Sequence, residues 1–600
     1  MTELDFSDHT DFDNADRGRI GQLVPGIIKH QDGRVVWDSD AFGFLQSEVP
    51  DTVDASLWRQ SQLTARQGLF EVADGIYQVR GLDLSNMTLV EGERGVIVID
   101  PLISTETAAA AYQLYQRHRG QREVTAVIYT HPHVDHFGGV LGVVDRTTTV
   151  PIVAPAHFME HAVSENVYAG TAMARRSMYY AGSSLDRSPT GTVGMGLGAA
   201  LSRGTVGLIA PTLDVTRTGQ DEVIDGVRIR FQMTPGTEAP AEMNFLFPDR
   251  RALCLAENAT HNLHNLLTLR GAQVRDARMW SRYLAEAVEL FADHADVAFA
   301  SHHWPTWGHE PIVRFLTQQR DMYAYLHDQT LRLLNQGYVG SEIAETIELS
   351  PALQQAWHAR GYYGSVSHGV KAIYQRYLGW YDGNPAHLWQ HPPEAAAARY
   401  VQAFNGSAAV LDKAQEFADS GDLRFAAELA SHAVFADSTN TDARELLASV
   451  LQKLGYGSEN ATWRNCFLMG AAELRGAIHQ TNIDQAPGLA PALSVTQLFD
   501  AIAIRIDGPK AWNERLNIRW QFTDTNERYR MELSNGALIH YPTTRDDPAD
   551  LTLSLTHPQL LALIGSGSLE SITVDGDSST LLRLLALTDR PDPDFPIVTP

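Results

Sequence analysis

The pattern of hydrophobic and polar positions first predicts a region in which strands and helices alternate. Three short apolar runs, GIYQVR, MTLVEG and GVIVID, lie at 75–80, 87–92 and 95–100 and are separated by turn residues, which predicts antiparallel strands. The segment 105–120 has helical spacing with a Thr cap and a Gly stop, and 124–130 is again an apolar strand. Further strands are expected within 223–236, 245–258 and 295–304, which predicts one α/β domain over residues 66–310.

The pattern of polar and apolar residues differs in the parts of the chain before and after this domain. Residues 1–65 are mixed and polar and predict an extended N-terminal arm, and the Gly-rich part of 165–220 predicts an insertion that encloses substrate. Residues 311–465 repeat apolar positions every three or four residues, which predicts an all-helical domain whose later part looks like a tetratricopeptide unit. Strand patterns return within 475–600 and end in Leu-rich helices, so we expect a separate α+β domain there.

Composition and charge exclude several classes of protein. A length of 600 residues with 44% hydrophobic and 20% charged residues indicates a folded, multidomain protein. The net charge of −25 argues against a nucleic-acid partner, and no apolar run reaches the ~20 residues of a transmembrane helix. The start lacks the pattern of a secretory signal, and only Cys254 and Cys466 are present, so we expect a cytoplasmic protein whose metal ligands are His, Asp and Glu.

One short motif carries the strongest chemical signal. The strand at 124–130 runs into HPHVDHFGG, which places His131, His133, Asp135 and His136 in a tight turn. Two alternating imidazoles can share one metal, while the carboxylate and imidazole beyond them can reach a second. The pair Gly138–Gly139 then allows close backbone packing where a helix starts. The motif therefore predicts a metal site rather than a solvated polar loop.

Other candidate ligands also follow apolar strands. Asp100 ends GVIVID and is either a supporting acid or a turn residue, while Glu238 and Glu257 follow the next two strand regions. His302 lies at the end of ADVAFAS, with the adjacent His303 as a competitor for the same ligand position.

These motifs resemble the metallo-β-lactamase superfamily and, within it, the alkylsulfatases. The phrases THPHVDHFGGV, TPGTEAPAEMN, AENATHNLHNLLTLRGAQVRDARMW, SHHWPTWG and YQRYLGWYDGNP match that family's motifs in order from about residue 65. In most of the superfamily a His occupies the loop where this chain has Glu238, and a bridging Asp is common where it has Glu257. The resemblance implies an αββα metallo-β-lactamase sandwich, an all-α dimerisation domain and an α+β domain like sterol carrier protein 2.

The resemblance also implies a ligand set for two Zn²⁺ ions. One ion would be bound by His131, His133 and Glu238, the other by Asp135, His136 and His302, and Glu257 would bridge them. Manganese or iron would also suit such oxygen and nitrogen ligands. Glu257 and Asp135 are the implied catalytic carboxylates beside a bridging water whose pKa two cations lower.

The resemblance further implies that Asn265 and Arg270 bind the sulfate group, and the planar fork of a guanidinium suits an oxyanion. The alternatives are that Arg270 is a structural partner of a nearby carboxylate and that Asn265 is a helix surface residue. His261 and His264 receive no role, and Tyr179 and Tyr180 are weaker candidates for the pocket.

The expected activity is hydrolysis of alkyl sulfate esters such as dodecyl sulfate to an alcohol and inorganic sulfate, by a homodimer whose C-terminal domain shelters the alkyl chain. Two alternatives remain at this point. One is another two-metal hydrolase of the same fold that acts on thioesters or phosphoesters. The other is a non-catalytic lipid-binding assembly protein.

Overall fold

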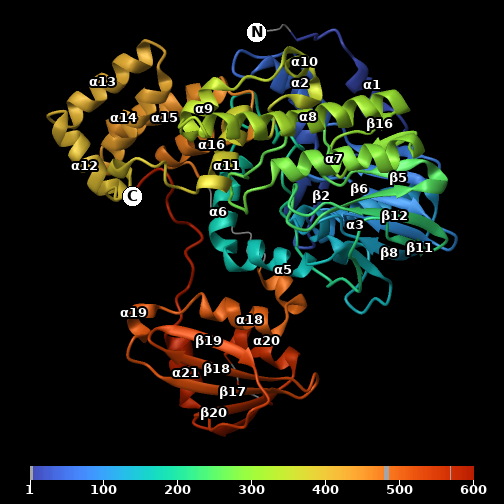
Figure 1. Ribbon diagram of the computed structural model, residues 1–600, viewed down its shortest axis with the longest axis vertical. Helices are drawn as coiled ribbons and strands as arrows, with labels where there is room; N and C mark the ends of the chain where they lie inside the picture. The colour runs from blue at the N-terminus through green and yellow to red at the C-terminus, as the bar shows by residue number, and fades with distance from the viewer. Residues whose placement is uncertain (1–3, 479–485, 568, 570) are drawn as a thin grey trace. The chain divides into compact units, whose positions relative to one another are not determined.

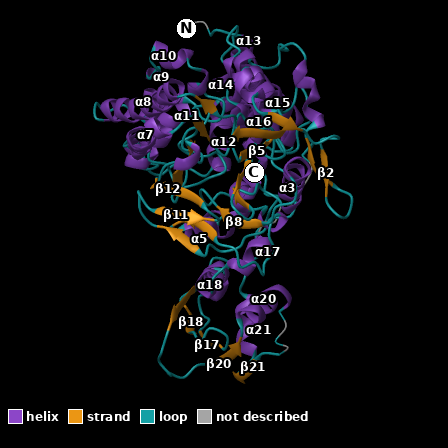
Figure 2. Cartoon of the chain, turned by 90° about the vertical axis from the view of Figure 1, so that its right-hand side faces the viewer, coloured by secondary structure: helices purple, strands orange, loops and turns teal. Residues whose placement is uncertain are grey.

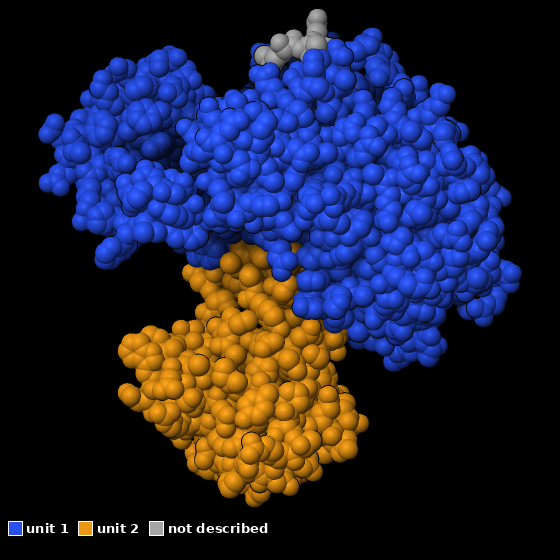
Figure 3. All heavy atoms as spheres, in the orientation of Figure 1, with its two compact units in different colours: residues 1–161, 174–483, 594–600 blue, residues 162–173, 484–593 orange. Residues whose placement is uncertain are grey.

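The computed structural model describes residues 4–478, 486–567, 569 and 571–600 (Figure 1). The chain divides into two compact units, shown in different colours in Figure 3. Unit 1 comprises residues 1–161, 174–483 and 594–600, and unit 2 comprises residues 162–173 and 484–593.

Unit 1 contains an eight-stranded sheet with the order β1-β4-β5-β6-β7-β8-β9-β10. Strands β7 to β10 pair in parallel and the others pair antiparallel. The strands predicted near 75–80, 87–92, 95–100 and 124–130 are confirmed as β5, β6, β7 and β8. The bounds are β1 (Arg19–Gly21), β4 (Gly68–Ala73), β5 (Ile76–Arg80), β6 (Met87–Glu91), β7 (Val96–Ile99), β8 (Val124–Ile128), β9 (Ile152–Pro155) and β10 (Leu213–Val215).

A second, six-stranded sheet has the order β11-β12-β13-β14-β15-β16. Apolar side chains from both sheets, such as Ile97 and Ile128 from one and Phe231 and Phe245 from the other, form one buried cluster, so the sheets pack face to face. The bounds are β11 (Asp221–Ile224), β12 (Val227–Met233), β13 (Met243–Phe247), β14 (Ala252–Cys254), β15 (Val297–Phe299) and β16 (Thr306–Trp307).

Helices cover the outer face of each sheet, which completes the expected αββα layers (Figures 1 and 2). Helices α2 (Ala55–Thr64) and α3 (Thr105–Arg119) share a core with the first sheet, and α7 (Ala277–Phe291) and α8 (His309–Leu334) share one with the second. The N-cap of α3 is Ser104, not the predicted Thr, because the Ser104 side chain accepts from the backbone of Thr107. Gly120 ends this helix as predicted.

Residues 1–65 differ from an extended arm. They contain α1 (Thr10–Asp16), the hairpin β2 (Ile27–Lys29) and β3 (Val35–Asp38), and the largely buried α2, while β1 pairs with β4 at the edge of the first sheet. The strands β1, β2 and β3 are only three or four residues long, so their residue pattern alone gave no signal of pairing.

Helices α4 (Val134–Phe137) and α5 (Phe158–Val163) precede the 165–220 region, and α6 (Gly170–Tyr180) lies within it. The following stretch 181–212 lacks helices and strands, yet much of it is buried, and Val193, Ala199 and Ala200 belong to the core beneath the first sheet. It is therefore a packed part of unit 1.

The helical region expected at 311–465 begins within the core of the αββα sandwich, since α8 packs against α7. Among the described helices, the later ones form a bundle of their own around Leu429, Ala433 and Leu447. The bounds are α9 (Gly340–Thr346), α10 (Pro351–Gln355), α11 (Val366–Leu378), α12 (Pro393–Ala403), α13 (Ser407–Asp419), α14 (Leu423–Ala436), α15 (Thr441–Tyr456) and α16 (Ala461–Leu474).

Unit 2 is the expected α+β fold, with a five-stranded sheet in the order β19-β18-β17-β20-β21. The sheet and helices enclose a core around Phe499 and Trp520, to which Val163 also belongs. The bounds are α17 (Ala486–Leu489), α18 (Val495–Ala503), α19 (Gly508–Ala511), β17 (Leu516–Phe522), β18 (Arg528–Ser534), β19 (Ala537–Pro542), β20 (Leu551–Leu555), α20 (His557–Ser566), β21 (Thr573–Gly576) and α21 (Ser579–Ala586). None of the helices in the described part of the chain is both long and apolar enough to cross a membrane.

Candidate metal centre

The HPHVDHFGG motif follows β8 and forms the first wall of the site. His131 and His133 precede the short helix α4, which carries Asp135 and His136, and all three imidazoles are buried. The predicted close packing after the motif is confirmed, because a Cβ on Gly138 or Gly139 would lie 2.2 or 2.1 Å from a carbonyl oxygen of the 101–103 loop. The glycines thus let the loop after β7 support the metal-binding turn.

The remaining candidate ligands reach the same point from the second sheet. Glu238 lies in the loop between β12 and β13, Glu257 follows β14, and His302 follows β15. The strands that precede these residues end at one edge of the sandwich, so ligands far apart in sequence converge. All three side chains are almost completely buried.

The structure gathers the seven predicted ligands into two groups that share one carboxylate. The first group is His131, His133, Glu238 and Glu257, and the second is Asp135, His136, Glu257 and His302. In each group one potential ligand atom per residue lies within 4.8 Å of all the others. A further overlapping group joins Asp100 to His131 and His136.

Glu257 is the meeting point of the two groups. Its Oε2 atom lies 3.4 Å from Nε2 of His131, 3.1 Å from Nε2 of His136 and 3.2 Å from Nε2 of His302. Although burial alone would raise the pKa of Glu257, these imidazoles hold it well below its usual range. One carboxylate oxygen therefore contacts imidazoles from both ligand groups.

The donor set fits a cation. Nε2 of His131 and Oε2 of Glu238 are buried and make no hydrogen bond, which is costly unless another group satisfies them. Two clusters of buried carboxylates and imidazoles are also the ligands that divalent metals take. The residues present therefore suit a metal centre.

Asp100 fixes the tautomers of two of these imidazoles. Its Oδ2 accepts from Nδ1 of His136 at 2.9 Å and from the Thr130 hydroxyl at 2.7 Å. Because the Thr130 hydroxyl donates its only hydrogen to Asp100, it accepts from Nδ1 of His131 at 2.9 Å. Nε2 of both imidazoles is thereby left for the metal. Asp100 is both a supporting acid and a strand-end residue, with a φ of 52°.

His302 and His303, the two candidates for one ligand position, make different hydrogen bonds. Nδ1 of His302 lies 3.2 Å from the Leu84 carbonyl, so it carries the hydrogen and Nε2 faces Glu257. His303 points elsewhere: its Nδ1 accepts from the backbone of His261 at 2.9 Å, and its Nε2 donates to the Gly196 carbonyl at 2.9 Å. His303 therefore joins loops and His302 faces the cluster.

Glu242 is a buried residue of the site that the sequence did not reveal. Its Oε1 accepts from the backbone of Glu257 at 3.1 Å, and its Oε2 contacts the Thr237 hydroxyl at 2.8 Å and the backbone of Ala239 at 3.2 Å. Glu242 thus joins the loops that carry Glu238 and Glu257. Burial, with the Glu238 carboxylate adding to it, raises the pKa of Glu242 to about 8. The only signal in the sequence was a second acid four positions after Glu238.

The side chains of Arg275 and His264 connect Asn265 to the two ligand groups. Its Oδ1 accepts from Arg275 at 2.5 Å, and Arg275 also donates to Glu238. His264, which received no role, contacts Oε1 of Glu257 at 2.8 Å through Nε2. Although burial would raise the pKa of Glu238, Arg275 is the largest influence lowering it to about 2.

The two tyrosines of α6 lie differently. Burial raises the pKa of the Tyr180 phenol. The charge of Arg270 opposes this shift and the charge of Asp135 adds to it, so Tyr180 lies near both side chains. Arg270 donates to the Gly271 carbonyl at 3.0 Å. The Tyr179 hydroxyl instead donates to the carboxylate of Glu473.

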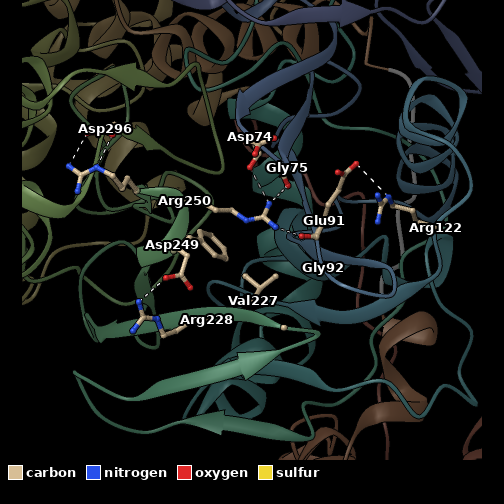
Figure 4. A pocket seen from close by; sticks show the side chains of 13 residues that line it. Asp74, Gly75, Glu91, Gly92, Arg122, Val227, Arg228, Asp249, Arg250 and Asp296 are labelled. Carbon is tan, nitrogen blue, oxygen red and sulfur yellow. Dashed lines mark hydrogen bonds and ion pairs between the residues drawn. The ribbon is translucent and has the colours of Figure 1, made fainter.

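A polar cavity of about 610 Å³ lies elsewhere in unit 1 (Figure 4). It includes Glu91 and Gly92, which precede β7, whereas Asp100 follows that strand, so the cavity lies towards the opposite end of β7 from the metal cluster. Its charges are paired: Arg228 contacts Asp249, and Arg250 donates to backbone carbonyls between the two sheets. It is a structural groove rather than part of the centre.

Comparison with known proteins identifies the family. Residues 80–302 match the metallo-β-lactamase superfamily, 339–477 match alkyl sulfatase dimerisation and 484–600 match alkyl sulfatase C-terminal. A linear primary-alkylsulfatase from a Pseudomonas species is 46% identical, and the match covers 100% of this chain and 91% of that protein. An alkyl/aryl-sulfatase from Saccharomyces cerevisiae is 45% identical, with 100% and 94% covered.

A solved structure gives the same result. The stereoselective inverting sec-alkylsulfatase Pisa1 from a Pseudomonas species has a TM-score of 0.97 and 42% identity, with 100% of this chain and 96% of that chain covered. Likeness at this level extends through the catalytic, helical and C-terminal regions. The chain therefore belongs to the alkylsulfatase family of hydrolases, which act on sulfate esters with a metallo-β-lactamase domain.

Proposed function

We propose that the protein hydrolyses alkyl sulfate esters such as dodecyl sulfate to an alcohol and inorganic sulfate at a dinuclear zinc centre. The observation that carries the proposal is the pair of ligand groups that share Glu257, with Asn265 linked to them through Arg275. The relatives named above support the substrate class.

In this proposal His131, His133 and Glu238 hold one zinc ion, and Asp135, His136 and His302 hold the other. Glu257 bridges them, which accounts for the three imidazole nitrogens around its Oε2. When bound, two zinc ions supply positive charge and lower the pKa of a water towards neutrality.

The chain's own residues then orient the ester. Arg270 offers a planar fork of donors to the sulfate group, and the Asn265 amide adds a donor. Although burial would raise the pKa of Asp135, His136 and His302 hold it well below its usual range. Asp135 is therefore ionised at neutral pH, and Asp135 and Glu257 are the two catalytic carboxylates of the proposal. The buried walls around these groups exclude bulk water and strengthen each charge interaction.

Release of inorganic sulfate from dodecyl sulfate tests the proposal directly. The zinc-loaded protein should release sulfate, and a thioester and a phosphomonoester of the same chain length should react far more slowly. Faster turnover of either control ester would assign the centre to another two-metal hydrolase. Zinc-free protein that binds dodecyl sulfate, with zinc-loaded protein that releases none, would favour the lipid-binding alternative.

Substitution at Arg270 tests the sulfate site. Arg270→Ala should raise KM and lower kcat, because the fork contacts both bound sulfate and its transition state. The matched control is Arg278→Ala, since Arg278 is an exposed arginine eight positions later. Equal kinetics for the two variants would remove Arg270 from the site.

The bond that breaks is distinguished by isotope. Hydrolysis in ¹⁸O-labelled water places the label in the alcohol if carbon is attacked and in sulfate if sulfur is attacked. A chiral secondary ester reports inversion in the same reaction.

The same proposal includes a homodimer formed through the helical region. The match of residues 339–477 to a dimerisation domain supports it, and so do Trp380 and Trp389, whose side chains in this region are 77% and 96% exposed. Solution scattering should give the mass of two chains. A monomeric mass at micromolar concentration would contradict this part of the proposal.

Unit 2 is assigned to the alkyl chain, as in a fold like sterol carrier protein 2. Its α20 and α21 expose Ile564, Leu582 and Leu585. Burying each CH₂ is worth about 0.8 kcal/mol, so a few methylenes suffice to change KM. Leu582→Asp should raise KM for dodecyl sulfate and spare a short-chain sulfate, with Val223→Asp in unit 1 as the exposed control. Equal effects on both chain lengths would contradict the assignment.

A further inference from the structure

A single guanidinium, that of Arg275, joins the metal-binding and sulfate-binding sides of the centre. Arg275 is 5% exposed and lies directly before the N-cap of α7. Its backbone N–H donates to the Leu266 carbonyl at 2.9 Å, and the next N–H, that of Asp276, donates to the Gly236 carbonyl at 2.8 Å. The backbone at 275–276 is therefore fixed to the loop of Asn265 and to the loop of Glu238.

The side chain repeats this connection. One terminal nitrogen, Nη2, donates to Oε1 of Glu238. The other, Nη1, donates to Oδ1 of Asn265 at 2.5 Å and to the Asn265 carbonyl at 2.8 Å. It also lies 3.1 Å from Nδ1 of His264, whose Nε2 contacts Glu257. The two ends of one rigid plane thus bind two different loops.

The contact with Glu238 determines which carboxylate oxygen faces the metal. Oε1 is occupied by Arg275, whereas Oε2 lies 2.9 Å from Nδ1 of His133 and 3.3 Å from Nε2 of His131. With one oxygen held by a charge-assisted hydrogen bond, Glu238 presents the other as a single, oriented ligand atom. Arg275 also balances part of the negative charge of the buried carboxylates.

The contact with Asn265 determines which way its amide points. A guanidinium has only donors, so the atom it contacts must be the amide oxygen. The NH₂ group of Asn265 is therefore turned away from Arg275. An NH₂ group is the part of this amide that can donate to a sulfate oxygen, whereas the carbonyl oxygen would repel it.

From these contacts we propose that Arg275 is a positioning residue that sets the metal-facing oxygen of Glu238 and the sulfate-facing NH₂ of Asn265 at the same time. The part of the proposal that concerns Asn265 rests on the sulfatase function proposed above. The part that concerns Glu238 rests only on the metal centre. The planar fork explains why the position needs arginine, because the single ammonium of lysine cannot reach both loops with the same geometry.

Two direct measurements on the purified, zinc-loaded protein test the proposal. The first is the rate of zinc release to an excess of a chromogenic zinc chelator, followed by the absorbance of its zinc complex. The second is the affinity for sodium sulfate, measured by calorimetry. Arg275→Met should release zinc about 10- to 100-fold faster, the range found when partners of metal ligands are removed. It should also bind sulfate at least tenfold more weakly. The exposed Arg278→Met should change neither quantity.

A double-mutant cycle separates positioning from general loosening of the fold. In an Asn265→Ala background, Arg275→Met should no longer weaken sulfate binding, because the amide that it orients is gone, while zinc release should still accelerate. If Arg275→Met does not fold, Arg275→Lys is measured in its place and should bind sulfate more weakly for the same reason.

Three outcomes would overturn the proposal: unchanged zinc release, unchanged sulfate affinity, or an effect on sulfate affinity that is equally large without the Asn265 side chain. Failure of the proposed function has a different signature. In that case the wild-type protein would release no sulfate from dodecyl sulfate, yet the zinc-release arm would still show whether Arg275 positions Glu238.

Discussion

Replacing Asp100 by Asn tests how far the supporting acid sets the metal affinity. Asp100 accepts from the Thr130 N–H at 2.8 Å, from the Thr130 hydroxyl and from His136, and also from the Ser301 hydroxyl at 2.5 Å. It thereby joins the ends of β7, β8 and β15. Asn has nearly the same shape and tolerates the positive φ of this position, so the substitution changes charge and acceptors but not the backbone.

The magnitude follows from the contacts that Asn cannot make. If the Asn oxygen keeps the three contacts of Oδ2, its NH₂ faces the Thr130 N–H, and an unpaired buried donor costs about 1–3 kcal/mol. His136 then donates to a neutral oxygen instead of a carboxylate. Loss of such a partner lowers metal affinity about 10- to 100-fold. The variant should therefore have a lower Tm without metal and also a weaker affinity for zinc.

Asp225 provides a matched control. It also has a positive φ of 47°, and its buried carboxylate accepts from the N–H groups of Arg94 and Gly95 and from the Thr125 hydroxyl. These contacts lie before β7, at the opposite end of the strand from Asp100. Asp225→Asn should lower the Tm by a similar amount and leave zinc affinity unchanged in chelator competition. Equal zinc affinities for the two variants would refute the role assigned to Asp100.

Three other predictions concern acids and imidazoles of unit 1. Because the pKa of Glu242 is raised to about 8, Glu242→Gln should keep the zinc content near the wild-type value and lower the Tm less than Glu242→Ala does; loss of zinc in the Gln variant would show that the residue acts as a carboxylate. Although burial opposes it, Glu257 and Asp135 raise the pKa of His302 to about 9, so this proton stabilises the metal-free protein below pH 6.5 and the stabilisation is lost as pH rises through 9. Zinc must displace the same proton, so zinc affinity measured by chelator competition should rise from pH 6 to 9, and a flat profile would contradict this. Glu473 accepts from Arg175 and from the N–H groups of Ile597 and Val598, so Glu473→Ala should lower the Tm and expose the last residues to carboxypeptidase, while an unchanged digestion rate would show that the tail is held by other contacts.

The sequence predicted most of the layers and the ligand candidates for one physical reason. His131, Glu257 and His302 each follow a buried apolar strand, and such strands are visible in a single sequence as short hydrophobic runs. Strands packed in one sandwich end at common edges, so residues directly after them meet. The short elements of the N-terminal 65 residues gave no such signal, since β1 is three residues long and depends on pairing with β4.

The supporting residues could not be predicted from the sequence because they act between loops. Arg275 contacts Glu238 across 37 positions, and Glu242 contacts the backbone of Glu257 across 15. No periodicity links such pairs. The choice between His302 and His303 likewise depends on the carbonyls of Leu84 and Gly196, which only the folded chain brings near.

The central claim is that hydrolysis of the sulfate ester needs a dinuclear centre bridged by Glu257. It is tested most directly by titrating metal-free protein with zinc and measuring sulfate release from dodecyl sulfate at each step. The account predicts that activity rises to a maximum at two zinc ions per chain and that Glu257→Ala shows no such rise. Full activity at one ion per chain, or activity in the metal-free protein, would contradict it.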